Sequence, residues 1–116
     1  MTERVESRLE LLDAELERFV KVASDEFGAE QIILFGSLAQ DRASASEWTD
    51  LDLVVIAETD LPFHRRIGEL LTRARFRVGA DVFVYTPAEW ERMKTQRPFV
   101  REEIVTKGKV VYERAG

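Results

Sequence analysis

Hydrophobic residues in the first part of the chain recur at steps of three and four positions. The series is Val5, Leu9, Leu12, Leu16, Phe19, Val20 and Ala23, and mostly charged or polar residues stand between its members. An apolar stripe of this period is typical of an amphipathic helix that packs one face on a core. We therefore expect a helix over about residues 3–27, with Gly28 as its C-cap.

Four later segments are short, apolar and rich in β-branched or aromatic residues, which is the pattern of buried strands. They cover residues 32–35, 53–56, 82–85 and 109–112. Helical spacing returns over 63–74, Thr86-Pro87-Ala88-Glu89 is a capping box that opens another helix, and a shorter helix is expected over 99–105. Strands and helices thus alternate, and this order predicts an α/β domain built around one sheet.

The composition narrows the class of protein. The 116 residues suit a single domain, with the helix at 3–27 followed by a core over about 28–113. Seventeen basic and twenty-two acidic residues give a net charge of −5, which argues against general nucleic-acid binding. No long apolar run or signal-like start is present, so we expect no membrane association and a cytoplasmic location. Cysteine is absent and His64 is the single histidine, so any metal must be held by oxygen atoms.

Two aspartates stand at the start of the second predicted strand. Side chains alternate across a strand, so Asp50 and Asp52 lie on one face and the leucines beside them point to the other. Carboxylates this close repel each other unless a cation lies between them, and oxygen-only ligation suits Mg²⁺. Asp81 stands at the start of the next strand and adds a third carboxylate if the two strands are neighbours.

The pair Gly36-Ser37 stands between the first predicted strand and a stretch compatible with a helix. Backbone N–H groups exposed at such a turn favour a phosphate. Each motif alone is weak, because aspartates at strand starts are often turn residues and any tight turn can use Gly-Ser. Their order and spacing together are more specific.

From the first to the second predicted strand the chain reads Leu34-Phe35-Gly36-Ser37, then twelve residues, then Asp50-Leu51-Asp52-Leu53-Val54-Val55. This arrangement resembles the signature of the nucleotidyltransferase superfamily related to the DNA polymerase β palm, and Ala80-Asp81-Val82-Phe83 stands where that superfamily has its third carboxylate. The length and the ending Gly108-Lys109-Val110-Val111-Tyr112-Glu113 are similar to the minimal nucleotidyltransferases. The resemblance implies a mixed β-sheet flanked by helices, and an antitoxin that acts beside a helical HEPN partner.

The resemblance also implies a role for each motif residue. Ser37 and the backbone of Gly36 would hold a nucleoside triphosphate, with ATP as the expected donor. Asp50 and Asp52 would ligate two Mg²⁺ ions. Asp81 would ligate one of these ions and help to deprotonate the attacking hydroxyl group.

A triphosphate also needs positive counter-charge. Arg42, Arg65 or Arg66 could supply it, although only the sign of their charge supports the choice. The acceptor implied by the resemblance is a HEPN toxin, modified on a tyrosine hydroxyl by AMP within a hetero-oligomer.

The chain departs from the pattern of its relatives around Asp41. Gln40-Asp41-Arg42 stands where relatives commonly carry a glycine, and the loop before the aspartates is about two residues longer. A negative side chain beside a phosphate site weakens nucleotide binding unless it points away or shares a cation. An inactive module that neutralises its partner by occlusion is therefore an alternative, as is a small-molecule nucleotidyltransferase. Trp48 either stacks on a nucleobase or anchors its loop.

Overall fold

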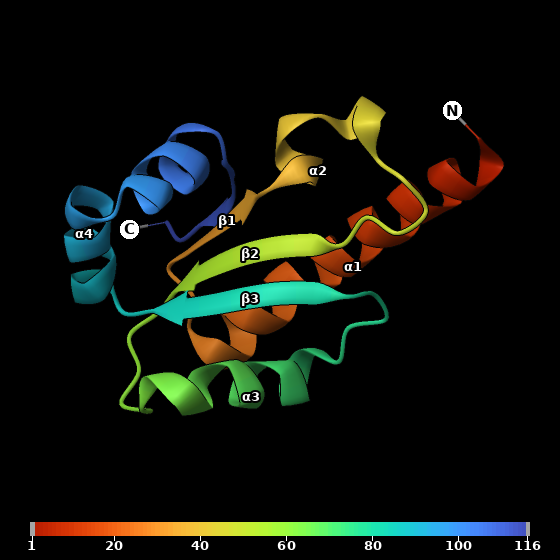
Figure 1. The fold of residues 1–116 in the computed structure, drawn as a ribbon. Helices are drawn as coiled ribbons and strands as arrows, with labels where there is room; N and C mark the ends of the chain where they lie inside the picture. The colour runs from red at the N-terminus through yellow and green to blue at the C-terminus, as the bar shows by residue number, and fades with distance from the viewer. Residues whose placement is uncertain (1, 116) are drawn as a thin grey trace.

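The computed structural model describes residues 2–115, which form one mixed sheet with helices on both faces (Figure 1). In chain order the elements are α1 (Glu3–Phe27), β1 (Gln31–Phe35), α2 (Ser37–Gln40), the 3₁₀ turn η1 (Arg42–Ser44), β2 (Leu51–Ile56), α3 (Phe63–Ala74), β3 (Ala80–Tyr85), α4 (Pro87–Gln96), the π-helical segment η2 (Val100–Thr106) and β4 (Lys109–Glu113). The predicted α/β class, the mixed sheet and the N-terminal helix are confirmed.

The four strands lie in the order β3-β2-β1-β4. β1 is antiparallel to both β2 and β4, whereas β2 and β3 are parallel. Parallel neighbours begin at the same edge of a sheet, and an antiparallel neighbour ends there. The end of β1 and the starts of β2 and β3 therefore meet at one edge, which carries the motifs identified in the sequence.

Helix ends follow the signals in the sequence. The Thr2 side chain accepts a hydrogen bond from the backbone N–H of Val5, at 3.2 Å, and Gly28 ends α1 in the left-handed conformation, with a φ of 73°. Thr86 and Glu89 form the predicted capping box at the start of α4. The predicted helix over 99–105 is replaced by the wider π-helical turn of η2.

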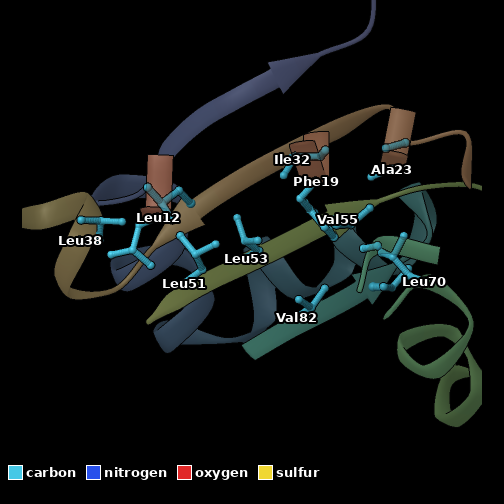
Figure 2. Packing of buried hydrophobic residues seen from close by; sticks show 14 of the residues in the cluster. Leu12, Phe19, Ala23, Ile32, Leu38, Leu51, Leu53, Val55, Leu70 and Val82 are labelled. Atoms are coloured by element: carbon cyan, nitrogen blue, oxygen red, sulfur yellow. The ribbon is translucent and has the colours of Figure 1, made fainter. Parts of the chain in front are cut away.

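Two apolar layers cover the two faces of the sheet. Helices α1 and α3 cover one face, and Leu12, Phe19 and Leu70 pack there against strand residues such as Leu53 (Figure 2). On the other face, Trp90 of α4 packs with residues of η2 over β1 and the second half of β2. No helix within residues 2–115 is long and apolar enough to cross a membrane.

Helix α1 also carries two buried or half-buried polar contacts to the segment between α3 and β3. Glu15 is only 2% exposed, and its carboxylate accepts hydrogen bonds from the Arg18 guanidinium and the backbone N–H of Arg77. Arg18 in turn donates to the carbonyl oxygens of Ala74 and Arg75. The hydrogen bonds from Arg18 hold the pKa of Glu15 below its usual value, against the opposing effect of burial.

Candidate active site

Two of the predicted carboxylates lie side by side at the edge where β2 and β3 begin. Asp52 of β2 pairs in register with Asp81 of β3 and, on its other side, with Phe35 of β1. Asp52 is half-buried while Asp81 is exposed. Burial raises the pKa of Asp52, and the negative charges of Asp81 and Asp50 raise it further. Negative charge is therefore concentrated at this edge. Within residues 2–115, no cationic side chain forms an ion pair with Asp52.

The Gly36-Ser37 turn lies directly against Asp52, one member of this carboxylate pair. Gly36 has a φ of 78° and a ψ of −161°, a region that side-chain-bearing residues rarely adopt. A Cβ atom at this position would lie 2.2 Å from Oδ2 of Asp52, so only a glycine allows the approach. Ser37 follows as the first residue of α2, and it is exposed.

Asp50 lies beside this pair but is held by a cationic side chain. It precedes β2 and is exposed, and its Oδ1 accepts a hydrogen bond of 2.7 Å from an Nη atom of Arg8 in α1. The Nε atom of Arg8 donates to the carbonyl oxygen of Thr49 at 2.8 Å. A Cβ atom on Gly79 would lie 2.7 Å from the carboxyl carbon of Asp50, so the loop before β3 also packs on this side chain.

The expected convergence of three acids is therefore reached only in part. Asp52 and Asp81 meet, whereas Asp50 is paired with Arg8, and the histidine and acidic side chains of residues 2–115 include no ready-made group of three around a metal position. The donor set nevertheless fits a hard divalent cation. It consists of carboxylate oxygens alone, and a cation would offset both the burial of the Asp52 carboxylate and the repulsion from its neighbours, which together raise its pKa.

The contact of Arg8 with Asp50 was not predicted from the sequence, but a signal for it exists. Arg8 follows Val5 by three positions and precedes Leu12 by four, so it lies on the apolar stripe of α1. Its side chain is only 19% exposed. A charged residue within an apolar stripe indicates a polar partner that reaches the packed face, and the same reasoning applies to Glu15 on the same stripe.

The turn after α2 settles the position of Asp41. Its carboxylate accepts the backbone N–H of Ala43 at 3.0 Å and so caps the 3₁₀ turn η1. This carboxylate oxygen of Asp41 is therefore hydrogen-bonded within its own turn. Arg42 makes two hydrogen bonds of 3.0 Å to Asp13 of α1, so it would reach a phosphate only by exchanging that partner.

Arg66 does not belong to this edge of the sheet, and its proposed role as a counter-charge is wrong. Its guanidinium contacts the carbonyl oxygens of Leu61 and Val84 and forms an ion pair of 2.6 Å with Glu89. Val84 lies near the end of β3, whereas Asp81 lies near its start. Arg65 is an exposed residue on the same turn of α3.

Trp48, between η1 and β2, is 80% exposed, so it does not anchor its loop to the body of the protein. The loop is instead ordered by polar contacts. Thr49 Oγ1 accepts the N–H of Ser46 at 2.8 Å, and Ser46 Oγ accepts the N–H of Trp48 at 3.1 Å.

The same fold occurs in nucleotidyltransferases and in toxin–antitoxin complexes of known structure. A proposed nucleotidyltransferase from Sulfolobus solfataricus aligns with a TM-score of 0.61 and 20% identity, covering 98% of this chain and 90% of that one. A chain of a toxin–antitoxin complex with AMP-PNP aligns with a TM-score of 0.56 and 22% identity, covering 84% of this chain and 73% of that one. A chain of a mutant MntA–HpeT toxin–antitoxin complex gives 0.55 and 22%, covering 85% and 72%. No protein-family model and no curated protein sequence matches the chain. The protein has the nucleotidyltransferase fold.

Proposed function

We propose that this protein is a Mg²⁺-dependent nucleotidyltransferase that transfers AMP from ATP to a hydroxyl group of a partner protein. A fold alone does not define an activity, so the proposal rests on one observation at the site. Asp52 pairs with Asp81, and the strained turn at Gly36 lies against Asp52. A carboxylate pair in contact with a turn that could bind phosphate is what phosphoryl-group chemistry with a divalent cation needs.

The residues would divide the work as follows. Asp52 and Asp81 would hold Mg²⁺, and Asp50 would join them after exchanging Arg8. Bound Mg²⁺ would neutralise charge on the phosphates and on the attacking oxygen. In the reaction, the acceptor oxygen forms a bond to the α-phosphorus, the bond from that phosphorus to the pyrophosphate oxygen breaks, and Asp81 takes the hydroxyl proton. Ser37 would contact the triphosphate.

We further propose that the partner is a HEPN-type toxin, and that the protein is its antitoxin. Two of the aligned chains come from toxin–antitoxin complexes, one of them with AMP-PNP, which supports a nucleotide-using antitoxin. In this proposal the toxin presents the hydroxyl group that is modified.

Intact-mass spectrometry tests this proposal. Candidate helical partners, beginning with the product of the adjacent reading frame, are incubated with the protein, Mg²⁺ and ATP. We expect a mass gain of one or more AMP units, lost with Asp52→Asn and retained with Asp60→Asn, which makes the same charge change at an exposed loop position. Absence of any gain with the wild-type protein on a partner that binds would overturn the enzymatic proposal.

An inactive binding module is the second candidate, and the Arg8–Asp50 pair favours it. A guanidinium at 2.7 Å already neutralises one of the three carboxylates that the reaction would use. In that case the partner binds tightly, its mass does not change, and added Mg²⁺ leaves the stability of the protein unaltered. Calorimetric titration with Mg²⁺ separates the two candidates before any partner is in hand.

A further inference from the structure

The sheet face that carries the carboxylates also carries exposed aromatic side chains. Residues two apart on a strand share a face, so Phe83 lies on the same face of β3 as Asp81, about 7 Å further along the strand. Helix α4 and η2 cover the far part of this face, around Trp90 and Ile104. Figure 1 shows α4 beside the ends of β2 and β3, away from the edge where these strands begin.

Three phenylalanines fill the stretch between the carboxylates and that cover. Phe35, the register partner of Asp52, is buried, and its ring centre lies 6.3 Å from that of Phe83 and 6.5 Å from that of Phe99. The ring of Phe99 stands at 87° to Phe35. The outer two rings are open to solvent, Phe83 at 38% and Phe99 at 60%. Exposed aromatic rings that share a buried aromatic neighbour are a feature of binding sites.

The neighbourhood of this surface specifies its occupant. A ligand held at Asp52 and Asp81 through a divalent cation must carry an anionic group. The first exposed aromatic ring, that of Phe83, belongs to the next residue after Asp81 on the same face of β3. A nucleotide joins phosphates to a flat aromatic ring within one molecule. Base–aromatic stacking tolerates any base and contributes about 1–3 kcal/mol per base.

We propose that Phe83 and Phe99 form the platform that holds the base of the donor nucleotide, one ring stacking on the face of the base and the other packing against its edge. This inference rests on the proposed nucleotidyltransferase function and deepens it. Phe35 links the two residues, because its buried ring lies next to both outer rings. The base then lies over the sheet face, while the triphosphate lies at the Gly36-Ser37 turn.

The test compares ATP with inorganic tripolyphosphate, which has the phosphates but no base. Affinities for both ligands are measured with Mg²⁺ by calorimetry for the wild type, Phe83→Ala and Phe99→Ala. We expect each substitution to weaken ATP binding about 5- to 150-fold and to leave tripolyphosphate binding within about twofold. Phe99→Trp keeps an aromatic face and should bind ATP at least as tightly as the wild type.

Phe63→Ala is the matched control. Phe63 is also an exposed phenylalanine, at 46%, but it stacks on Tyr85 at the opposite end of β3. It should leave the affinities for both ligands unchanged. As a spectroscopic readout, 2-aminopurine riboside triphosphate should lose fluorescence on binding the wild type and retain more of it on Phe99→Ala, because stacking quenches this base.

The possible failures point to different errors. If the wild type binds ATP and both alanine variants bind it equally well, the platform is wrong and the proposed function stands. The platform is also wrong if ATP and tripolyphosphate lose affinity equally, or if the variants lose affinity only for a protein partner. If the wild type binds neither ATP nor tripolyphosphate, the proposed function fails and the platform fails with it.

Discussion

Removing the negative charge of Asp52 should stabilise the protein while removing the proposed metal site. Paired residues on neighbouring strands lie about 5 Å apart. Two unit charges at that distance repel by about 3 kcal/mol at an effective dielectric constant of 20, and by less than 1 kcal/mol in water. Asp52 is half-buried and Asp81 is exposed, so the lower part of this range applies. We expect Asp52→Asn to raise the free energy of unfolding without metal by about 1 kcal/mol.

Adding Mg²⁺ should reverse the order of stability. A ligand that binds only the folded state at ten times its dissociation constant stabilises that state by about 1.4 kcal/mol. The wild type should gain this amount, and Asp52→Asn should gain little. Urea unfolding, followed by tryptophan fluorescence with and without Mg²⁺, measures both effects.

Asp60→Asn is the control for the change in net charge, because Asp60 is exposed in the loop before α3. It should match the wild type in both conditions within about 0.5 kcal/mol. If Asp52→Asn proves no more stable than this control without metal, the repulsion argument is refuted. If Mg²⁺ stabilises both variants equally, Asp52 is not a metal ligand.

Three further predictions follow from the contacts around the site. Gly36→Ala should lower the free energy of unfolding by about 2–3 kcal/mol, from backbone strain and the clash with Asp52, and a thermal melt like that of the wild type would contradict this. Arg8→Gln removes a cation that competes for Asp50, so calorimetry should find Mg²⁺ binding tightened several-fold; weaker binding would mean that Arg8 orders the loop for the metal. The pKa of Glu15 is lower in the folded protein than in the unfolded chain, so ionised Glu15 stabilises the fold at pH values above its unfolded pKa of about 4.3. This stabilisation is lost as the pH falls through the folded pKa. Glu15→Gln should therefore be less stable at pH 7 and should show a shallower loss in acid, measured by urea unfolding across pH.

Local patterns predicted most of the fold because each pattern has a local physical cause. The stripe from Val5 to Ala23 predicts α1, and the capping box at Thr86 predicts the start of α4, since both depend on neighbours within a few positions. The wide turn of η2 could not be predicted in this way. Its backbone is constrained by Val100 and Ile104, which pack into the apolar layer over the sheet.

Pairings between distant charges were out of reach of the sequence. Arg8 and Asp50 are 42 positions apart in the sequence. A chain with seventeen basic and twenty-two acidic residues allows very many such ion pairs, and the local sequence around each residue does not distinguish between them. The same ambiguity misplaced Arg66, which has the right sign for a phosphate but is buried against Glu89 at the opposite end of β3. The sequence predicts the meeting of Asp52 with Asp81 only on the condition that their strands are neighbours, and strand order cannot be inferred from it; the parallel pairing of β2 with β3 supplies that condition.

Helix α1 links these findings, since its polar contacts reach both loops that lead into the carboxylate strands. Arg8 holds the backbone and side chain at 49–50, just before β2, and the Glu15–Arg18 pair holds the backbone at 74–77, before β3. Half-buried charges with several hydrogen bonds fix geometry more than they add stability. A site whose carboxylates must face one metal needs such support at the entry of each strand. Loss of the Glu15–Arg18 contacts before β3, which bring no competing charge to the carboxylates, should therefore disturb metal binding before it unfolds the sheet.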